Sequence, residues 1–140
     1  MKRTTAQLLE VLKNQKNYDD YVKENEENFV TGKPCDLLTT EIEKRGFSKA
    51  EIIRNSGIER HYAYQILSGV KNPSRDKIIM FCIGMGMNLE ETQHFLLECA
   101  ASSLYAKNKR DNVTLFAIEN HLSIIELNDL LYELNLEIYD

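Results

Sequence analysis

The fold of this chain is decided by residues 47–91, which read FSKAEIIRNSGIERHYAYQILSGVKNPSRDKIIMFCIGMGMNLEE. The stretch predicts three consecutive helices joined by tight turns, over residues 49–55, 59–67 and 75–85. Ser48 and Ser74 are residue types that cap helix N-termini, and Gly57 can supply the left-handed residue that ends the first helix. Asn72-Pro73 requires an extended residue before the proline, which separates the second helix from the third.

The second of these helices has a polar face that the fold itself does not need. On a helical wheel its polar residues fall within about 140° of one another, and they are Arg60, His61, Tyr64, Gln65 and Ser68. The opposite side holds Tyr62, Ala63, Ile66 and Leu67. Two short helices across a glycine-containing turn form a helix-turn-helix unit, whose second helix can enter the major groove of DNA.

This stretch resembles the phage-repressor-like, or XRE-type, helix-turn-helix regulators. The resemblance is carried by residues 47–52 (FSKAEI), 56–58 (SGI), 68–69 (SG), 71–74 (KNPS) and 86–91 (GMNLEE). With a preceding helix around residues 36–45, it covers less than half of the chain. It implies an all-α, lambda-repressor-like DNA-binding domain over residues 35–92. Residues 1–34 would then form an N-terminal helical extension, and residues 93–140 a C-terminal one that serves dimerisation or a partner.

The resemblance also implies which residues contact DNA. In such regulators the start of the first helix and the exposed side of the second contact bases or nearby phosphates, and here these positions hold Lys49, Arg60, His61, Tyr64 and Gln65. Arginine or lysine can pair with guanine, and glutamine with adenine. Ser68, Lys71 and Asn72 suit contacts to the DNA backbone. Glu59 is expected to interact with the helix dipole rather than with a base.

One departure from the family pattern concerns the contact between the two helices. The family places a small residue in the first helix and a branched residue in the second, whereas this chain has Ile53 and Ala63. We interpret the reversal as a volume swap, tolerated because the total volume is kept.

Composition favours a small, almost wholly helical protein. The chain has 140 residues, of which 43% are hydrophobic, and only two prolines and six glycines. No stretch has the length of a membrane span, and the N-terminus does not look like a secretory signal. Three widely spaced cysteines, Cys35, Cys82 and Cys99, indicate a reducing cytoplasm in which they are ordinary buried thiols.

The charge distribution bears on nucleic-acid binding. Residues 93–140 carry three basic and eight acidic side chains, which accounts for the whole net charge of −5. Residues 54–77 contain five basic side chains and only two acidic ones, Glu59 and Asp76. The basic residues are Arg54, Arg60, Lys71, Arg75 and Lys77. Attraction to phosphate depends on such a local field more than on the total charge.

The flanking segments also predict helices. Thr4 and Gln7 fit a capping box for a helix over residues 5–14, and Tyr18, Tyr21 and Val22 share one side of a second. This pair is too short to hold a core alone, so we expect it to dock on the chain, a second copy or another protein. Residues 24–28 are expected to form an acidic, solvated end to the second helix. Residues 31–34 are the best candidate for a linker between this helix pair and the rest of the chain.

Three further helices are predicted after the motif. Asn88 begins one that runs to about Ser102, a basic connector follows at residues 107–111, and two more helices cover 111–120 and 124–134. The apolar ending at residues 134–139 is expected to pack, against the chain itself or a second subunit. We expect the connector to be a solvated turn, and the alternative is a second DNA site.

Competing interpretations remain open at several residues. The polar face of the second motif helix is alternatively a merely solvated surface, and Tyr64 can pack at the domain edge. His94 and His121 are expected at the surface or core edge rather than on a metal. No nucleophile motif, phosphate-binding loop or metal-spaced cluster is present, so we expect neither an enzyme nor a cofactor.

The favoured interpretation is a cytoplasmic, sequence-specific transcriptional regulator that inserts residues 59–68 into the major groove of double-stranded DNA. It would act as a homodimer on a two-fold site. The alternative is a protein-binding adaptor, antitoxin or inhibitor built on a helix-turn-helix scaffold. The acidic C-terminal third and the N-terminal helices favour that alternative, with the N-terminal or C-terminal helices contacting a protein partner.

Overall fold

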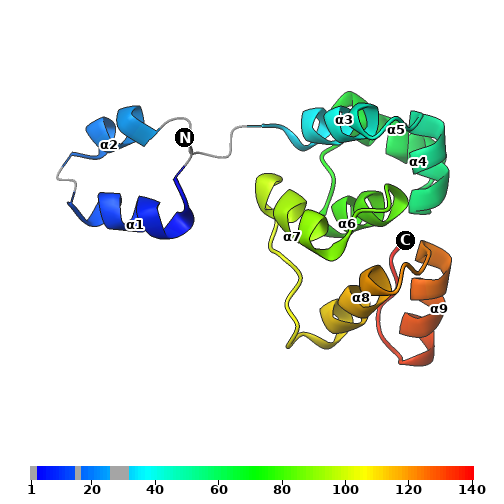
Figure 1. The fold of residues 1–140 in the computed structure, drawn as a ribbon. Helices are drawn as coiled ribbons and strands as arrows, with labels where there is room; N and C mark the ends of the chain where they lie inside the picture. The colour runs from blue at the N-terminus through cyan, green and yellow to red at the C-terminus, as the bar shows by residue number, and fades with distance from the viewer. Residues whose placement is uncertain (1–2, 15–16, 26–31) are drawn as a thin grey trace. The chain divides into compact units, whose positions relative to one another are not determined.

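The computed structural model describes residues 3–14, 17–25 and 32–140, and all the regular structure in these ranges is helical (Figure 1). The chain forms two compact units, residues 1–31 and residues 32–140. In the first unit the helices are α1 (Thr5–Asn14) and α2 (Tyr18–Asn25). In the second they are α3 (Pro34–Lys44), α4 (Lys49–Ser56), α5 (Arg60–Ser68), α6 (Arg75–Gly84), α7 (Leu89–Glu98), α8 (Lys109–Glu119) and α9 (Ile124–Glu133).

The N-terminal unit is a small helical pair. The capping box predicted at its start is present, because Gln7 N–H donates to Thr4 Oγ1 at 3.2 Å and Thr4 N–H donates to Gln7 Oε1 at 2.8 Å. No residue of α1 is buried, and Tyr21 on α2 is buried, with its hydroxyl donating to the Leu8 carbonyl. Residues 26–28 of the predicted acidic end and residue 31 of the predicted linker lie outside the described residues.

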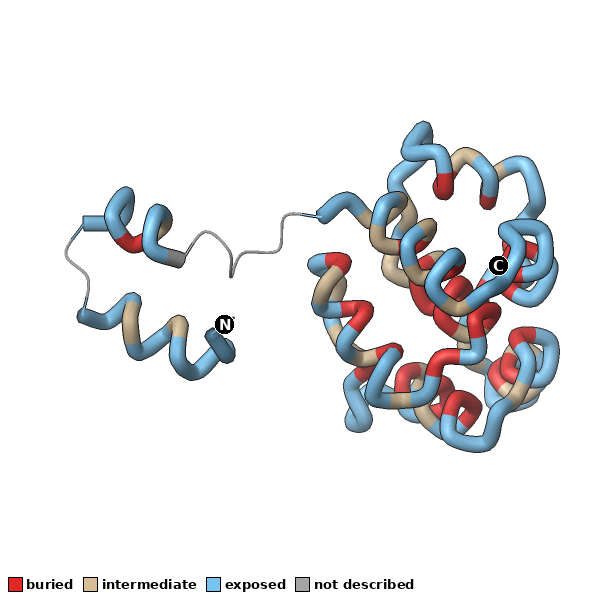
Figure 2. The backbone as a smooth tube through the Cα atoms, turned by 45° about the horizontal axis from the view of Figure 1, so that its top comes forward, coloured by how far each residue is buried: buried red, intermediate tan, exposed pale blue. Residues whose placement is uncertain are grey.

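The second unit is built in three helical layers. Helices α3, α4 and α5 contact one another, α6 and α7 lie below them in Figure 1, and α8 and α9 form the far layer. The buried residues, red in Figure 2, gather where these layers face each other. One apolar cluster runs from Leu38 on α3 to Tyr139 near the end of the described chain.

Helix α6 is the centre of this unit, because it packs against α4 on one side and contacts α7 and α9 on others. Its residues are buried on almost every side, namely Ile78, Ile79, Met80, Phe81, Cys82 and Gly84. The backbones of α6 and α4 come very close at Gly84, where a Cβ would lie only 3.0 Å from the Ile52 carbonyl oxygen and the Ser56 nitrogen. A glycine is therefore needed there for α4 to reach the core.

The boundaries of the motif helices agree with the sequence prediction to within two residues. Ser48 and Glu51 form a capping box at the start of α4, which the left-handed Gly57 (φ +75°) ends. Gly69 (φ +87°) ends α5, and the Ser74 hydroxyl accepts a hydrogen bond from the Lys77 N–H at the start of α6.

Helix α7 is shorter than predicted. The sequence favoured a helix to about Ser102, but α7 ends at Glu98 because Ala100 adopts a left-handed conformation (φ +57°). The segment that follows α7 is held by Gln93, whose side-chain amide donates to the Leu104 carbonyl and accepts from the Leu104 N–H. These two hydrogen bonds replace those that another helical turn would have supplied.

The prediction of a connector over residues 107–111 was wrong for residues 109–111, which belong to a helix. Helix α8 begins at Lys109, two residues before the predicted start, and Asn108 caps it by accepting from the Asp111 N–H at 3.0 Å. Arg110 is not a solvated turn residue, because only 17% of its side chain is exposed and it pairs with Asp76. Lys107 and Lys109 are exposed.

The apolar ending packs against the chain itself. Tyr139 is only 1% exposed, and its hydroxyl lies 2.8 Å from the Thr114 hydroxyl. The side-chain amide of Asn128 donates to the Tyr139 carbonyl and accepts from the Tyr139 N–H, and the Arg110 guanidinium lies 4.0 Å from the centroid of the Tyr139 ring. Across the residues that the structure describes, none of the helices has the length and apolarity to cross a membrane.

Candidate functional site

Helix α5 presents the polar face that the helical wheel predicts. Arg60, His61, Tyr64 and Ser68 are exposed and Gln65 is half-buried, whereas Ala63, Ile66 and Leu67 are buried. The Arg60 guanidinium lies 5.9 Å from the centroid of the Tyr64 ring, close enough for a cation–π contact. The face is thus open to solvent within the unit formed by residues 32–140.

Glu59 caps the start of α5. Its two carboxylate oxygens accept from the backbone N–H groups of His61 (2.9 Å) and Tyr62 (2.8 Å). The bonds from Tyr62 and then His61 lower the pKa of the Glu59 carboxyl below its ordinary value. The geometry supports the expected interaction with the helix dipole, because these N–H groups carry its positive end.

The remaining predicted site residues flank α5. Lys49 is exposed in the first turn of α4, and Lys71 and Asn72 are exposed in the loop that follows α5. The Lys71 backbone N–H donates to the Gln65 carbonyl at 3.1 Å, which folds this loop back onto the helix. We call these eight residues the α5 surface: Lys49, Arg60, His61, Tyr64, Gln65, Ser68, Lys71 and Asn72.

A hollow of about 400 Å³ lies between α4 and α5, beside this surface. It is lined by Ala50, Ile53, Arg54, Gly57, Ile58, Arg60 and Tyr64. Two guanidinium groups and one aromatic ring therefore border an otherwise apolar hollow. Such a lining can accept an anionic group at its rim and a flat or methylated group on the ring.

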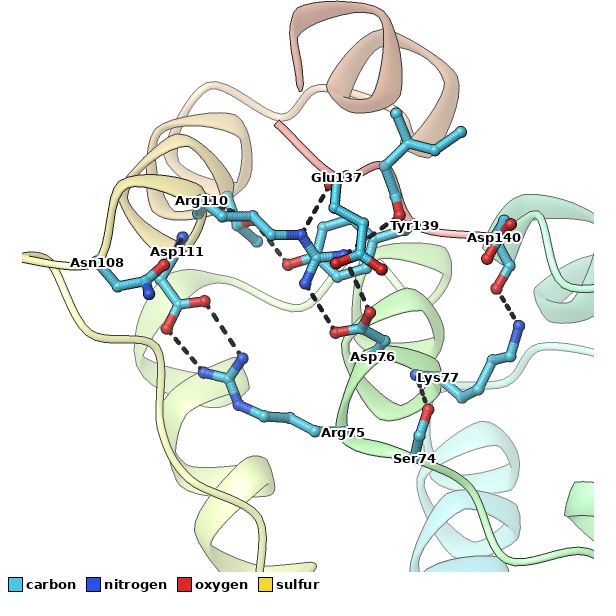
Figure 3. A network of polar contacts seen from close by, with 12 residues as sticks. Ser74, Arg75, Asp76, Lys77, Asn108, Arg110, Asp111, Glu137, Tyr139 and Asp140 are labelled. Carbon is cyan, nitrogen blue, oxygen red and sulfur yellow. Dashed lines mark hydrogen bonds and ion pairs between the residues drawn. The ribbon is translucent and has the colours of Figure 1, made fainter. Parts of the chain in front are cut away.

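Fewer of the cations near α5 are free than the sequence count suggests, because two of the five counted cations have partners from the C-terminal part of the chain (Figure 3). Arg75 forms an ion pair with Asp111 at 2.9 Å, and Lys77 donates to the Asp140 carbonyl oxygen. Asp76, counted as a local acid, pairs with Arg110 on α8. A count of charges within residues 54–77 therefore leaves out the partners that α8 and the C-terminal segment bring to these residues.

The Arg75–Asp111 pair is largely enclosed. Two nitrogens of Arg75 donate to the two oxygens of Asp111, whose side chain is 10% exposed. Burial alone would raise the pKa of the Asp111 carboxyl, but the hydrogen bonds from Arg75 and from the Tyr105 backbone N–H outweigh it and lower that pKa. Sequence reasoning missed this network, although the repeated Arg-Asp dipeptides at 75–76 and 110–111 were a visible signal.

Two of the three cysteines agree with the prediction of buried thiols, and the two histidines outside α5 are exposed. Cys82 and Cys99 are buried, and burial raises the pKa of both thiols, that of Cys99 to about 11. Cys35 is only half-buried, which differs from the prediction of a buried thiol. His94 is exposed and lies 2.5 Å from Glu98 on the same helix. His121 is exposed after the end of α8, and no group of three metal-ligating side chains occurs in the described ranges.

Both residues of the proposed volume swap are in the core. Ile53 is 4% exposed and Ala63 is fully buried, on helices that contact each other. The swap itself remains a prediction, which unfolding of an Ile53 variant can test.

No protein-family model, curated protein or solved structure matches this chain. The resemblance to the phage-repressor-like regulators therefore stays a prediction that rests on the motif residues.

Proposed function

We propose that the chain is a sequence-specific DNA-binding regulator with a lambda-repressor-like helix-turn-helix, and that α5 enters the major groove. The observation that carries the proposal is the exposed polar face of α5, which no described helix of residues 32–140 covers. A helix that is apolar on one side and open on the other matches the geometry of a recognition helix.

The side chains of this face suit the edges of base pairs. Arg60 has a fork of donors for guanine O6 and N7, and Gln65 can bond bidentately to adenine N6 and N7. Tyr64 offers its ring to a thymine methyl group or its hydroxyl to a phosphate. Arg60 and Gln65 therefore carry sequence discrimination in this proposal.

The flanking residues suit the sugar–phosphate backbone. Lys49, Lys71 and Asn72 are exposed at the two ends of the motif, where contacts position a protein on DNA without reading sequence. Since Arg75 and Lys77 have partners within the chain, these contacts are few. We therefore expect moderate affinity for a single chain, which a homodimer on a two-fold site would raise.

Selection from a random-sequence DNA pool, combined with a salt titration and a mass measurement in solution, tests the proposal. A DNA reader enriches a half-site motif, and its affinity falls steeply with salt by a slope set by its phosphate contacts. Lys107→Ala, at an exposed lysine away from the α5 surface, is the matched control and should leave selection unchanged. No enrichment at low salt would reject the proposal.

A second candidate function is a protein-binding adaptor, antitoxin or inhibitor. It is favoured by large apolar side chains on the acidic C-terminal helices, where Phe116 is 54% exposed, Ile125 71% and Tyr132 78%. Such residues are enriched at protein interfaces. If the pool yields no motif, the same mass measurement made with candidate protein partners distinguishes this alternative.

A further inference from the structure

The two Arg-Asp dipeptides belong to a longer repetition in the chain. Arg75 and Asp76 lie in the first turn of α6, and Arg110 and Asp111 lie in the first turn of α8, at a spacing of 35 residues. The same spacing relates identical residues along both helix pairs: Phe81 and Phe116, Ile83 and Ile118, Glu91 and Glu126, Leu96 and Leu131, and Glu98 and Glu133.

The backbone repeats at this spacing too. Gly86 (φ +69°) and His121 (φ +55°) both adopt the left-handed conformation after the first helix of each pair. Ala100 (φ +57°) and Asn135 (φ +58°) do the same after the second helix. A non-glycine residue is uncommon in this conformation, so its recurrence at matched positions is informative.

The helix starts repeat as well. Asn88 caps α7 in a capping box with Glu91, and Ser123 caps α9 in a capping box with Glu126. These four residues are again related by 35 positions. The same local hydrogen bonds therefore begin the second helix of each pair.

A pair of hydrogen bonds between an amide side chain and the backbone of a residue eleven positions later also occurs twice. The Gln93 side chain donates to the Leu104 carbonyl at 2.9 Å and accepts from its N–H at 2.7 Å. The Asn128 side chain makes the same two bonds with Tyr139, at 2.7 and 2.8 Å. In each pair an amide side chain thus holds the segment that follows the second helix.

The two helix pairs contact each other reciprocally, as Figure 3 shows at their shared centre. Arg75 of the first pair binds Asp111 of the second, and Arg110 of the second binds Asp76 of the first. Arg75 also donates to the carbonyls of Ser102 and Ser103, and Arg110 donates to those of their counterparts Glu137 and Ile138. Helix α6 contacts α9, and α8 correspondingly contacts α7.

We propose that α6–α7 and α8–α9, each with its following segment, are two copies of one helix-pair motif that associate within the chain as an internal dimer. In a two-fold interface, residue i of one copy contacts j of the other, and j contacts i. The paired arginines and aspartates have this arrangement. The C-terminal copy therefore covers the surface of α6 that faces it, and this pairing is independent of any ligand of α5.

The copies differ on their outer faces, which explains why only the first one carries α4. Phe81 and Gly84 of α6 are buried, whereas their counterparts Phe116 and Glu119 on α8 are exposed. A helix packs closely on α6 because position 84 has no side chain, and a glutamate at the matching position of α8 prevents the same approach.

Two double-mutant cycles on the full chain test the internal dimer. The first combines Arg75→Met with Asp111→Asn, and the second combines Arg110→Met with Asp76→Asn. The unfolding equilibrium constant is measured in urea by circular dichroism, over a 100-fold range of protein concentration.

We expect each single substitution to shift the equilibrium toward the unfolded state about tenfold or more. In each cycle the double variant should lose about as much stability as the less stable single variant, because both members of a contacting pair are gone. Both cycles should show coupling, since each pair joins the two copies. The exposed pair Lys107→Met and Asp129→Asn is the control, and its effects should simply multiply.

Multiplicative effects in either cycle would overturn the proposal, as would coupling in one cycle without coupling in the other. It would also be overturned if breaking the pairs removed a concentration dependence of the wild-type unfolding midpoint, because the pairs would then join two chains rather than two halves of one.

Discussion

Phe81 and Phe116 are the same residue type at matched positions of two helices, yet Phe81 is fully buried and Phe116 is 54% exposed. We predict that Phe81→Ala lowers the free energy of unfolding by about 3–5 kcal/mol, because it removes a large side chain from a packed core. Phe116→Ala should change it by less than about 1 kcal/mol. Urea unfolding of the two variants side by side measures both, and equal losses would contradict the burial difference.

Ile53 tests the packing of α4 on α5. Because Ile53 is buried against the apolar cluster, Ile53→Ala should leave a cavity and lower the free energy of unfolding by about 2–5 kcal/mol. Denaturant unfolding measures this loss. A loss well under 1 kcal/mol would refute the volume swap with Ala63.

At the scale of elements, the close approach of α4 and α6 depends on Gly84. Gly84→Ala gains about 1 kcal/mol of helix propensity, but its Cβ would lie 3.0 Å from backbone atoms of α4. Overpacking of this kind costs about 1–3 kcal/mol, and backbone atoms cannot move aside as a side chain can. We therefore predict that Gly84→Ala lowers the stability measured by thermal unfolding, whereas Glu119→Ala on α8 should leave that stability unchanged.

Helix α5 provides the prediction that bears on function. If α5 reads bases, Arg60→Ala should weaken binding to the selected DNA by about 1–3 kcal/mol and relax the preference at one position. Lys71→Ala should weaken binding to all sequences alike and reduce the salt slope by about one. Fluorescence anisotropy with selected and scrambled duplexes measures both effects. An equal loss on both duplexes for Arg60→Ala would assign it to the DNA backbone instead.

For the whole molecule, the Asp111 carboxylate links stability to pH. Its pKa is lower in the folded protein than its ordinary value, because the hydrogen bonds from Arg75 and Tyr105 outweigh its burial. The stability it contributes is therefore complete above the ordinary carboxyl pKa of about 4 and is lost as the pH falls through the folded-state pKa. We predict that Asp111→Asn is less stable at neutral pH, and that its difference from wild type shrinks below about pH 4. Urea unfolding from pH 7 to pH 3 measures that difference, and a constant difference would contradict the prediction.

Local signals in the sequence were sufficient for most of the helices. Serine and glycine at the ends of α4, together with Glu59 and Gly69 around α5, place these helices within two residues, because capping and left-handed turns involve only neighbouring groups. The polar face of α5 followed from helical periodicity for the same reason. The function of that face remains a prediction.

Patterns among neighbouring residues were enough to predict that the chain is helical and where its helix caps lie, since both depend on residues a few positions apart. The arrangement of the helices in space, in contrast, determined which charges near α5 remain available, because Arg75 and Arg110 meet their aspartates 36 and 34 positions away. It likewise decided that α7 ends early and that residues 134–139 pack on their own chain. Such contacts depend on how helices distant in the sequence are brought together, and no local pattern encodes that distance.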